Sequence, residues 1–355
     1  MSESGATVDH FQQVADSKNL SQLIRSNTVH YWTAMKHQVD LGGLNSYLRY
    51  EGMLAGDPHA GNFAVLPLRK LGGSRKMRYV NVDFDDCGRG PFVLDFIRFV
   101  IASKANHREV KRRALEKAYR KGLEGKEIDP PKKVRDLLAM PVADYDAMAA
   151  QYLQKRSTDK GFIFKPGEIE PYSAKIRRID IESLFGGDKV IDLGIRPETR
   201  GGSAGELRIW VIVERRGGGR RLMELKQYDE PATAKYQAQA GPQQRLRAIR
   251  GAFWPDLDGS DYELIELRGG GLFWVREKRV ALIDLPYSSE DKKQIDFLDE
   301  LEIYDANQLG LAHGRQRGAP DYRASIDASP EAFHDATEPV AKAYLAIATK
   351  AFASK

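Results

Sequence analysis

Two short polar segments that flank one strand-like run place the strongest constraint on this chain. The first is Gly56-Asp57-Pro58-His59-Ala60-Gly61-Asn62-Phe63, and the second is Val82-Asp83-Phe84-Asp85-Asp86. The apolar run 77–82 leads directly into the second segment. Each segment alone is typical of a turn, because Asp, Pro, Gly and Asn all favour turns. The two segments in this order, with a hydrophobic strand between them, are much harder to obtain by chance and indicate one polar site.

The residue types in these segments match the requirements of phosphoryl transfer. One carboxylate must orient the attacking hydroxyl, and an amide oxygen and a second carboxylate must hold magnesium against the phosphates. Magnesium prefers oxygen ligands and keeps several waters, so two protein ligands suffice. We therefore predict Asp57 as the catalytic residue, Asn62 and Asp83 as magnesium ligands, and Asp85 as a further ligand.

The same segments resemble the H-G-D-x-H-x-x-N and I-D-F-D motifs of aminoglycoside and choline phosphotransferases. The run Gly90–Arg98 also resembles the stretch that follows the metal-binding Asp in those enzymes. The chain departs from the pattern at Ala55, where many members carry the His of H-G-D or H-R-D, which usually braces the loop.

From about Leu48 onwards, the chain is similar to uncharacterised, mainly bacterial proteins grouped as a domain of unknown function with a protein-kinase-like fold. Three later segments carry this resemblance: Arg200–Glu206, Leu222–Lys226 and Gly310–Arg315. It implies an α+β, bilobal fold that uses ATP and Mg²⁺. The residues that would hold the nucleotide phosphates are Gly201, Gly202, Ser203, Gly205 and Lys226.

The pattern of apolar residues predicts helices followed by a strand-rich part and then more helices. Helices are expected over much of 1–50 and at 91–124, 141–155, 243–252, 299–312 and 329–353, and strands at 77–84, 189–195, 207–213, 222–227, 262–267 and 272–275. We predict a large lobe that begins with residues 1–165, a small β-rich lobe at 166–288, and C-terminal helices at 289–355 that complete the large lobe. Because the catalytic-loop segment precedes the Gly-rich sheet, we predict a circularly permuted arrangement.

Lys226 is expected to face Asp83 across a cleft, although the two are far apart in sequence. A Gly-rich turn lets backbone N–H groups approach phosphates without interference from a Cβ atom. The strand 262–267, with Glu266, is expected to be the hinge strand that meets adenine. A glutamate that braces Lys226 is not evident, and Glu230 is the nearest candidate.

Three other residues near these motifs are predicted to support the fold. Asp95 and Arg98 lie one helical turn apart and are expected to brace the loops. His313 is expected to pack or form hydrogen bonds without taking part in chemistry. Cys87 is the single cysteine, so the chain can form no internal disulfide and no thiolate zinc site, and we interpret it as a small filler residue.

The composition is that of a soluble protein, with 42% hydrophobic and 30% charged residues. No run is long enough to span a membrane and no signal peptide is evident, so a cytoplasmic location without membrane contact is expected. The basic stretch 104–135 predicts an amphipathic helix with a solvated cationic face. RNA binding through that face is the least favoured hypothesis, because aromatic stacking residues are missing there.

Two functions remain open. The first is an ATP- and magnesium-dependent phosphotransferase whose acceptor hydroxyl belongs to a small molecule, with a protein acceptor or AMP transfer as alternatives. The second is a catalytically weak or inactive pseudokinase that binds nucleotide or a partner. Ala55 and the missing glutamate favour the second, and the presence of Asp57, Asn62 and Asp83 favours the first.

Overall fold

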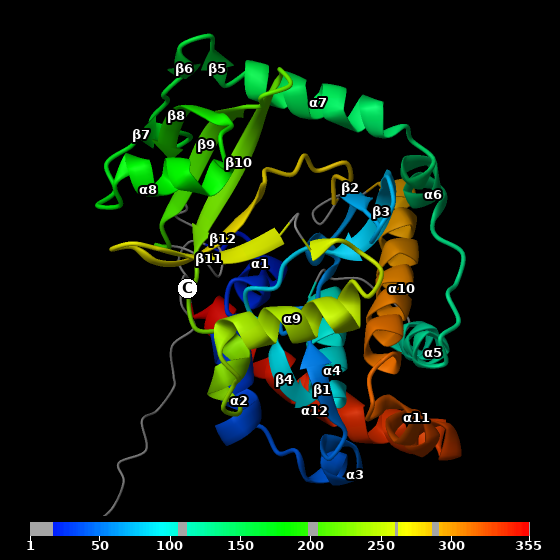
Figure 1. Ribbon diagram of the computed structural model, residues 1–355. Coiled ribbons are helices and arrows are strands. Elements are labelled where there is room, and N and C mark those ends of the chain that lie inside the picture. The colour runs from blue at the N-terminus through cyan, green and yellow to red at the C-terminus, as the bar shows by residue number, and fades with distance from the viewer. Residues whose placement is uncertain (1–16, 106–111, 198–204, 260–261, 286–290, 355) are drawn as a thin grey trace, which may run out of the picture.

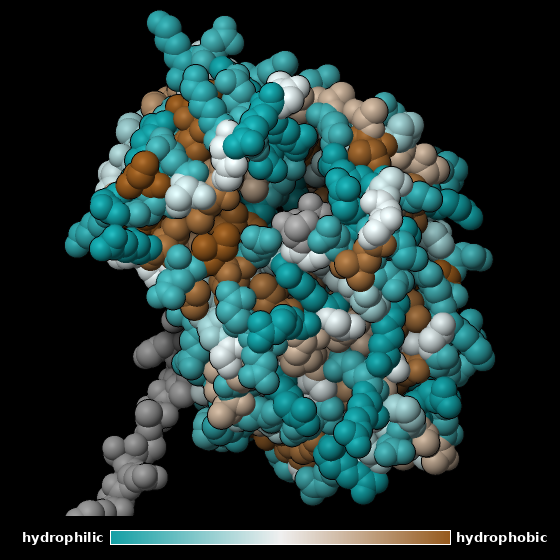
Figure 2. Space-filling model, in the orientation of Figure 1, coloured by the Kyte–Doolittle hydropathy of each residue, from teal (hydrophilic) through white to brown (hydrophobic). Residues whose placement is uncertain are grey.

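A computed structural model describes residues 17–105, 112–197, 205–259, 262–285 and 291–354. The chain has a mixed α+β fold, in which a β-sheet lies above a body made mainly of helices (Figure 1). Hydrophilic side chains cover most of the face seen in Figure 2, which is hollowed beneath α7, between the sheet and the β2–β3 hairpin. Among the described residues, no helix is both long and apolar enough to cross a bilayer.

The principal sheet has six antiparallel strands in the order β11-β12-β10-β9-β8-β7. Its strands are β7 Glu170–Pro171, β8 Lys189–Ile195, β9 Arg208–Glu214, β10 Arg220–Gln227, β11 Tyr262–Leu267 and β12 Gly271–Glu277. The central strand β9 is rich in β-branched residues and is buried on both faces, as such a run predicts. One face carries an apolar cluster that includes Ile181 of the short helix α8 (Arg178–Glu182).

Three two-stranded ribbons accompany this sheet. They are β1 Glu51–Leu54 with β4 Gly88–Pro91, β2 Phe63–Arg69 with β3 Arg75–Asn81, and β5 Ser157–Thr158 with β6 Gly161–Phe162. The β2–β3 hairpin matters most for the site. Phe63 pairs with Asn81, and the Val82 N–H donates to the Asn62 carbonyl over 2.8 Å. The hairpin therefore brings Asn62 and Asp83 to the same end of one ribbon.

The helical body combines segments from both ends of the chain. Its helices are α1 Leu20–Arg25, α2 Thr28–His37, α3 Asn45–Leu48, α4 Phe92–Lys104, α5 Arg112–Leu123, α6 Lys132–Leu138, α7 Val142–Gln154, α9 Pro242–Phe253, α10 Lys292–Gly314, α11 Ala319–Ala328 and α12 Pro330–Ala353. Short 3₁₀ turns lie at Gly42–Leu44, Ala60–Asn62, Ser183–Phe185 and Ala232–Lys235. Almost every residue of α4 is buried, including Asp95 and Arg98, which places this helix at the centre.

One large hydrophobic cluster holds the body together. It joins residues of α1 and α2 to α4, α10 and α12, and it also includes Leu246 of α9 and Trp274 of β12. The N-terminal and C-terminal helices thus share a core, as expected of segments that complete one another. The boundaries at residues 165 and 288 stay a prediction.

The predicted helices and strands are largely present, but several elements were not predicted. The pattern did not indicate the helices α6, α8 and α11 or the short strands β4, β5, β6 and β7. Pro131 is the N-cap residue of α6, and Pro320 lies in the first turn of α11. Proline fits the first turn of a helix because its missing N–H would have no partner there, so the same residue can mark a start or a stop.

The basic stretch forms the amphipathic helix α5, but its described arginines are not simply solvated. Arg112 pairs with Glu116 at 2.8 Å inside the protein. Arg113 reaches Glu331 of α12, and Arg120 reaches Asp327 of α11, each at 2.7 Å. These ion pairs tie α5 to the C-terminal helices and leave less cationic charge for an RNA backbone.

Candidate functional site

The loop after β1 is held by hydrogen bonds from the central helix. Both carboxylate oxygens of Asp95 accept backbone N–H groups, from Ala55 and Gly56, each at 2.9 Å. His313 lies 3.1 Å from the same carboxylate, and its other ring nitrogen lies 2.7 Å from the Tyr119 hydroxyl. These contacts agree with the predictions that Asp95 braces the loop and that His313 forms hydrogen bonds.

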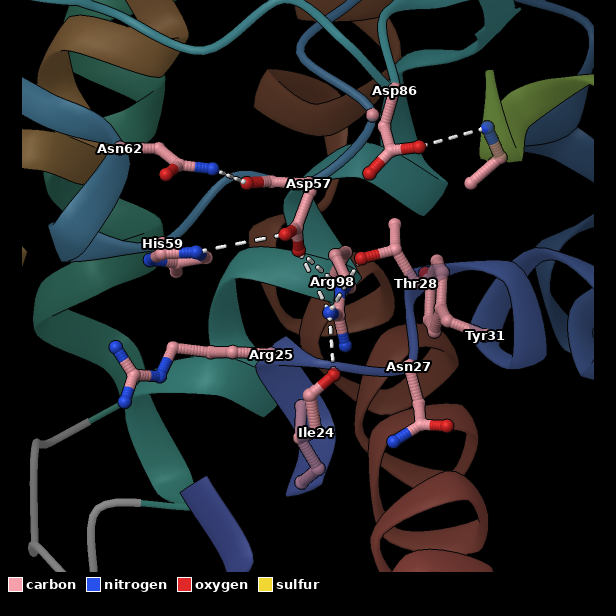
Figure 3. Close-up of polar contacts among 12 residues, drawn as sticks. Ile24, Arg25, Asn27, Thr28, Tyr31, Asp57, His59, Asn62, Asp86 and Arg98 are labelled. Carbon is pink, nitrogen blue, oxygen red and sulfur yellow. Dashed lines mark hydrogen bonds and ion pairs between the residues drawn. The ribbon is translucent and has the colours of Figure 1, made fainter. Parts of the chain in front are cut away.

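Asp57 forms a buried ion pair with Arg98 of α4 (Figure 3). The guanidinium donates to Asp57 Oδ1 over 2.7 and 3.0 Å and also donates to the Ile24 carbonyl over 2.8 Å. His59 Nε2 approaches the other carboxylate oxygen at 3.6 Å. Burial by itself would raise the pKa of Asp57, but Arg98 and His59 outweigh it and hold that pKa well below its usual range. Asp57 is therefore an ionised group in a fixed orientation.

Asn62 contacts the Asp57 loop through its amide nitrogen. Its Nδ2 donates to the Asp57 carbonyl over 2.9 Å, which turns the side chain toward the loop (Figure 3). The Asp83 backbone N–H donates to Asn81 Oδ1 over 3.3 Å, whereas Asp83 Oδ1 is buried with no hydrogen-bond partner among the described residues. An unpartnered buried carboxylate oxygen is a feature that a cation would satisfy.

Phe84 anchors the acidic segment between its two aspartates. Its ring is fully buried among Phe253, Trp254 and Tyr262, with centroid separations of 6.1, 5.1 and 5.6 Å. Edge-to-face packing of this kind fixes the ring. Burial raises the pKa of Asp83 to about 6, and the nearby Asp85 carboxylate acts in the same direction.

Lys226 reaches the acidic segment from the sheet. This β10 side chain is buried, and its Nζ forms an ion pair with Asp85 Oδ2 and lies 3.3 Å from Glu206 Oε2. Although burial opposes the charge, the carboxylates of Asp85, Asp83 and Glu206 raise the pKa of Lys226. Lys226 therefore reaches the acidic segment by pairing with Asp85, and the expectation that it faces Asp83 across a cleft stays a prediction.

The prediction that Glu230 braces Lys226 is wrong. Glu230 pairs with Lys235 at 3.1 Å, and the acidic partners of Lys226 are Asp85 and Glu206. Glu206 was visible in the sequence as the acid directly after the Gly-rich run, but no rule of spacing assigned it to Lys226. Burial raises the pKa of Glu206 to about 7, with Lys226 opposing that shift.

Backbone contacts dock the acidic segment on the sheet side. Asp86 Oδ1 accepts the Ala232 N–H over 2.9 Å, and burial together with Asp57 raises the pKa of Asp86 to about 7. Arg276 and Arg279, at the end of β12, both donate to the Val82 carbonyl. Sequence reasoning missed these arginines, because nothing in their spacing links them to residues almost two hundred positions earlier.

The remaining predicted nucleotide contacts are the Gly-rich run and Glu266. Gly201, Gly202 and Ser203 lie outside the described residues. Gly205 is exposed, with a φ of +87° and open space around it. Glu266 is exposed on the edge strand β11, the strand that also supplies Tyr262, whose hydroxyl lies 3.5 Å from Asp85. Its role in meeting adenine stays a prediction.

Cys87 follows the acidic segment as a buried side chain. Burial raises the pKa of its thiol to about 12, so the thiol stays protonated at neutral pH. The prediction of a filler residue is in keeping with this setting.

Comparisons with known proteins add no relative. No protein-family model, no curated protein and no solved structure matches this chain.

Proposed function

We propose that this chain is an ATP- and magnesium-dependent phosphotransferase that transfers a phosphoryl group to a hydroxyl acceptor, most simply a small molecule. The observation that carries the proposal is the ion pair between Lys226 and Asp85, across 141 positions of sequence. It puts the one buried lysine of strand β10 beside the segment that holds Asp83, with Asp57 and Asn62 on the adjoining loop. Phosphoryl transfer needs this combination of cation and carboxylates.

A protein-kinase-like, circularly permuted arrangement is part of the same proposal. In kinases the Gly-rich loop precedes the lysine strand, and the lysine lies on the third strand of the sheet. Here β8, β9 and β10 are consecutive antiparallel neighbours, the Gly-rich run connects β8 to β9, and Lys226 is on β10. The catalytic loop precedes this unit in sequence, and the C-terminal helices return to the core of the body.

In this proposal each residue has a distinct task. Asp57, kept ionised by Arg98, orients the acceptor hydroxyl and receives its proton late in the reaction, because a carboxylate of low pKa is a weak base. Asn62 and Asp83 would hold Mg²⁺, and Asp85 becomes an additional ligand when Lys226 turns to the phosphates. When bound, Mg²⁺ neutralises charge on the phosphate oxygens. The described residues contain no group of three or more His, Cys, Asp or Glu side chains arranged for a metal, so phosphate and water oxygens would complete the shell.

ATP hydrolysis and thermal stability test this proposal. With magnesium, ATP should raise the melting temperature and be hydrolysed slowly, and Asp57→Asn should abolish hydrolysis while leaving ATP-induced stabilisation in place. If ATP stabilises the protein neither with nor without magnesium, the proposal fails.

One specific feature favours the pseudokinase alternative: the side chains of Asp57 and Lys226 already form ion pairs within the protein. Asp57 is fully engaged by Arg98, and Lys226 is engaged by Asp85 and Glu206. A module that only binds nucleotide or a partner could keep these pairs permanently. Equal hydrolysis by the wild-type protein and Asp57→Asn would favour this alternative.

A further inference from the structure

A polar cavity lies on the principal sheet, beneath α7. Its volume is about 350 Å³, and its wall contains Tyr152, Arg156, Glu168, Ile169, Arg196, Arg208, Trp210 and Lys278. In Figure 1, α7 runs across the end of the sheet above β9 and β10. Leu153 of α7 joins Trp210 and Leu222 in a small apolar cluster that closes one side. A volume of this size suits a single small molecule.

Cationic side chains dominate the wall of this cavity. Among the described lining residues, four are Arg or Lys and Glu168 is the only carboxylate. Arg196 donates to the carbonyls of Gly167 and Glu168 at 3.1 and 2.8 Å, and Arg156 donates to the Tyr152 carbonyl at 3.1 Å. The acceptors of these two guanidinium groups are neutral carbonyl oxygens. Those hydrogen bonds therefore do not neutralise the positive charge.

The nearest buried carboxylate is already shared among several cations. Glu224 lies 2.8 Å from Arg276, and 3.5 Å from both Arg208 and Lys278. It also accepts from the Trp210 indole at 3.2 Å. Burial lowers the pKa of Lys278, and although Glu224 opposes that shift, Arg276 and Arg208 add to it. Among the described lining residues, the cavity thus has more cations than carboxylates.

The aromatic residues give the cations fixed positions. Arg156 stacks on the Tyr152 ring at 3.7 Å, and Arg196 and Lys278 each lie 5.6 Å from the centre of Trp210. A guanidinium held in place by an aromatic ring loses less conformational freedom when it binds an oxyanion. Several cations fixed around a small space are the arrangement that recognises phosphate groups.

We propose that this cavity binds a compact, multiply charged anion with phosphate-type oxygens. The site is separate from the residues assigned to magnesium, so it does not depend on phosphoryl transfer by this chain. It nevertheless lies on the face of the sheet that carries Lys226, because Lys226 pairs with Arg208 and Glu224 pairs with Trp210 across β9 and β10. The anion is either a free polyphosphate-type ligand or the phosphate tail of a nucleotide.

Isothermal titration calorimetry with sodium tripolyphosphate, at low salt and with EDTA, tests the proposal. The wild-type protein should bind one equivalent, and the double variant Arg156→Gln, Arg196→Gln should bind at least about tenfold more weakly, because charge-assisted hydrogen bonds are lost. This variant strands no carboxylate, since both side chains bond to carbonyl groups. Melting temperatures of all variants verify folding.

A matched control removes the same charge elsewhere. Arg216 and Arg220 also donate to backbone carbonyls, at the turn end of the β9–β10 hairpin. The control Arg216→Gln, Arg220→Gln should bind tripolyphosphate within about twofold of wild type, because neither residue lines the cavity and Arg220 already lies 3.6 Å from Glu214. No binding by the wild type, undiminished binding by the cavity variant, or an equal loss in the control would overturn the proposal.

Two further measurements separate the sources of the anion and the two proposals. Displacement of tripolyphosphate by ATP but not by adenosine assigns the cavity to a nucleotide phosphate tail, and simultaneous binding of ATP assigns it to a free anion. Asp83→Asn should leave metal-free tripolyphosphate binding unchanged. The two proposals can therefore be refuted independently: the protein could bind ATP with magnesium and not tripolyphosphate, or tripolyphosphate and not ATP with magnesium.

Discussion

Arg98 and Asp57 form a buried ion pair across 41 positions, in which the guanidinium reaches the carboxylate at 2.7 Å and also bonds to the Ile24 carbonyl. Arg98 is completely buried, so its charge depends on Asp57 for compensation. This relationship joins the central helix to the loop that carries the proposed catalytic residue. The position of Asp57 therefore depends on the packing of the core around Arg98.

Removal of Arg98 should therefore destabilise the fold. Arg98→Met leaves Asp57 as an uncompensated, mostly buried carboxylate, and the loss should be about 3–5 kcal/mol. The double variant Arg98→Met, Asp57→Asn should recover part of that loss, because the stranded charge is gone. Urea denaturation of the wild type, the two single variants and the double variant measures this. A cost below about 1 kcal/mol for Arg98→Met would show that the pair is unimportant to stability.

Gly56 should tolerate no side chain. Its φ is +82°, and a Cβ atom would lie 2.0 Å from the Asp86 carbonyl oxygen. Gly72→Ala is the matched control, because Gly72 has a φ of +66° and open space around it. Both alanines strain the backbone by about 1–3 kcal/mol, and only Gly56→Ala adds the collision with the acidic segment. Equal unfolding free energies for the two variants would contradict the close approach of the two loops.

Phe84 should fix the acidic segment through packing alone. Phe84→Ala is expected to cost about 3–5 kcal/mol, since it leaves a cavity among aromatic rings, and Phe84→Leu should cost much less. Denaturant unfolding of both variants provides the values. A Phe84→Ala protein as stable as the wild type would place Phe84 outside the core.

Glu206 should make stability fall as the pH rises. Its pKa is raised from 4.5 to about 7 in the fold, mainly by burial. The folded state therefore binds more protons than the unfolded state between these two values. The stabilising contribution is complete below about pH 4.5 and is lost as the pH approaches 7. Relative to Glu206→Gln, the wild type should lose stability over this window. A constant difference, or one of opposite sign, measured by unfolding at pH 5, 6, 7 and 8 would contradict the buried setting of Glu206.

Much of the secondary structure could be predicted from local sequence patterns. The strand β9 is recognisable because Leu207–Val213 is a continuous β-branched run, and α12 because Ser329 precedes Pro330, a cap that the structure contains. Asp57, Asn62 and Asp83 could be proposed as site residues because phosphoryl transfer requires carboxylate and amide side chains. The helix α11 was not predicted, because a proline such as Pro320 can mark the end of a helix as well as its first turn.

The partners of the site residues could not be inferred in the same way. Arg98 was expected to brace a loop, but nothing in its spacing assigned it to Asp57. Glu206 and Arg276 meet the acidic segment only because the sheet folds back on the hairpin. Such contacts depend on the tertiary arrangement, and a single sequence holds no pattern of fixed period for them.

Equilibrium binding of ATP, with and without magnesium, tests the central claim that Lys226 and Asp83 meet the same nucleotide. Magnesium should tighten ATP binding to the wild type by at least about tenfold. Asp83→Asn should remove that tightening and keep the metal-free affinity, whereas Lys226→Met should weaken binding under both conditions. Calorimetric titration that finds no effect of magnesium on the wild type, or a full magnesium effect in Asp83→Asn, would contradict the assignment.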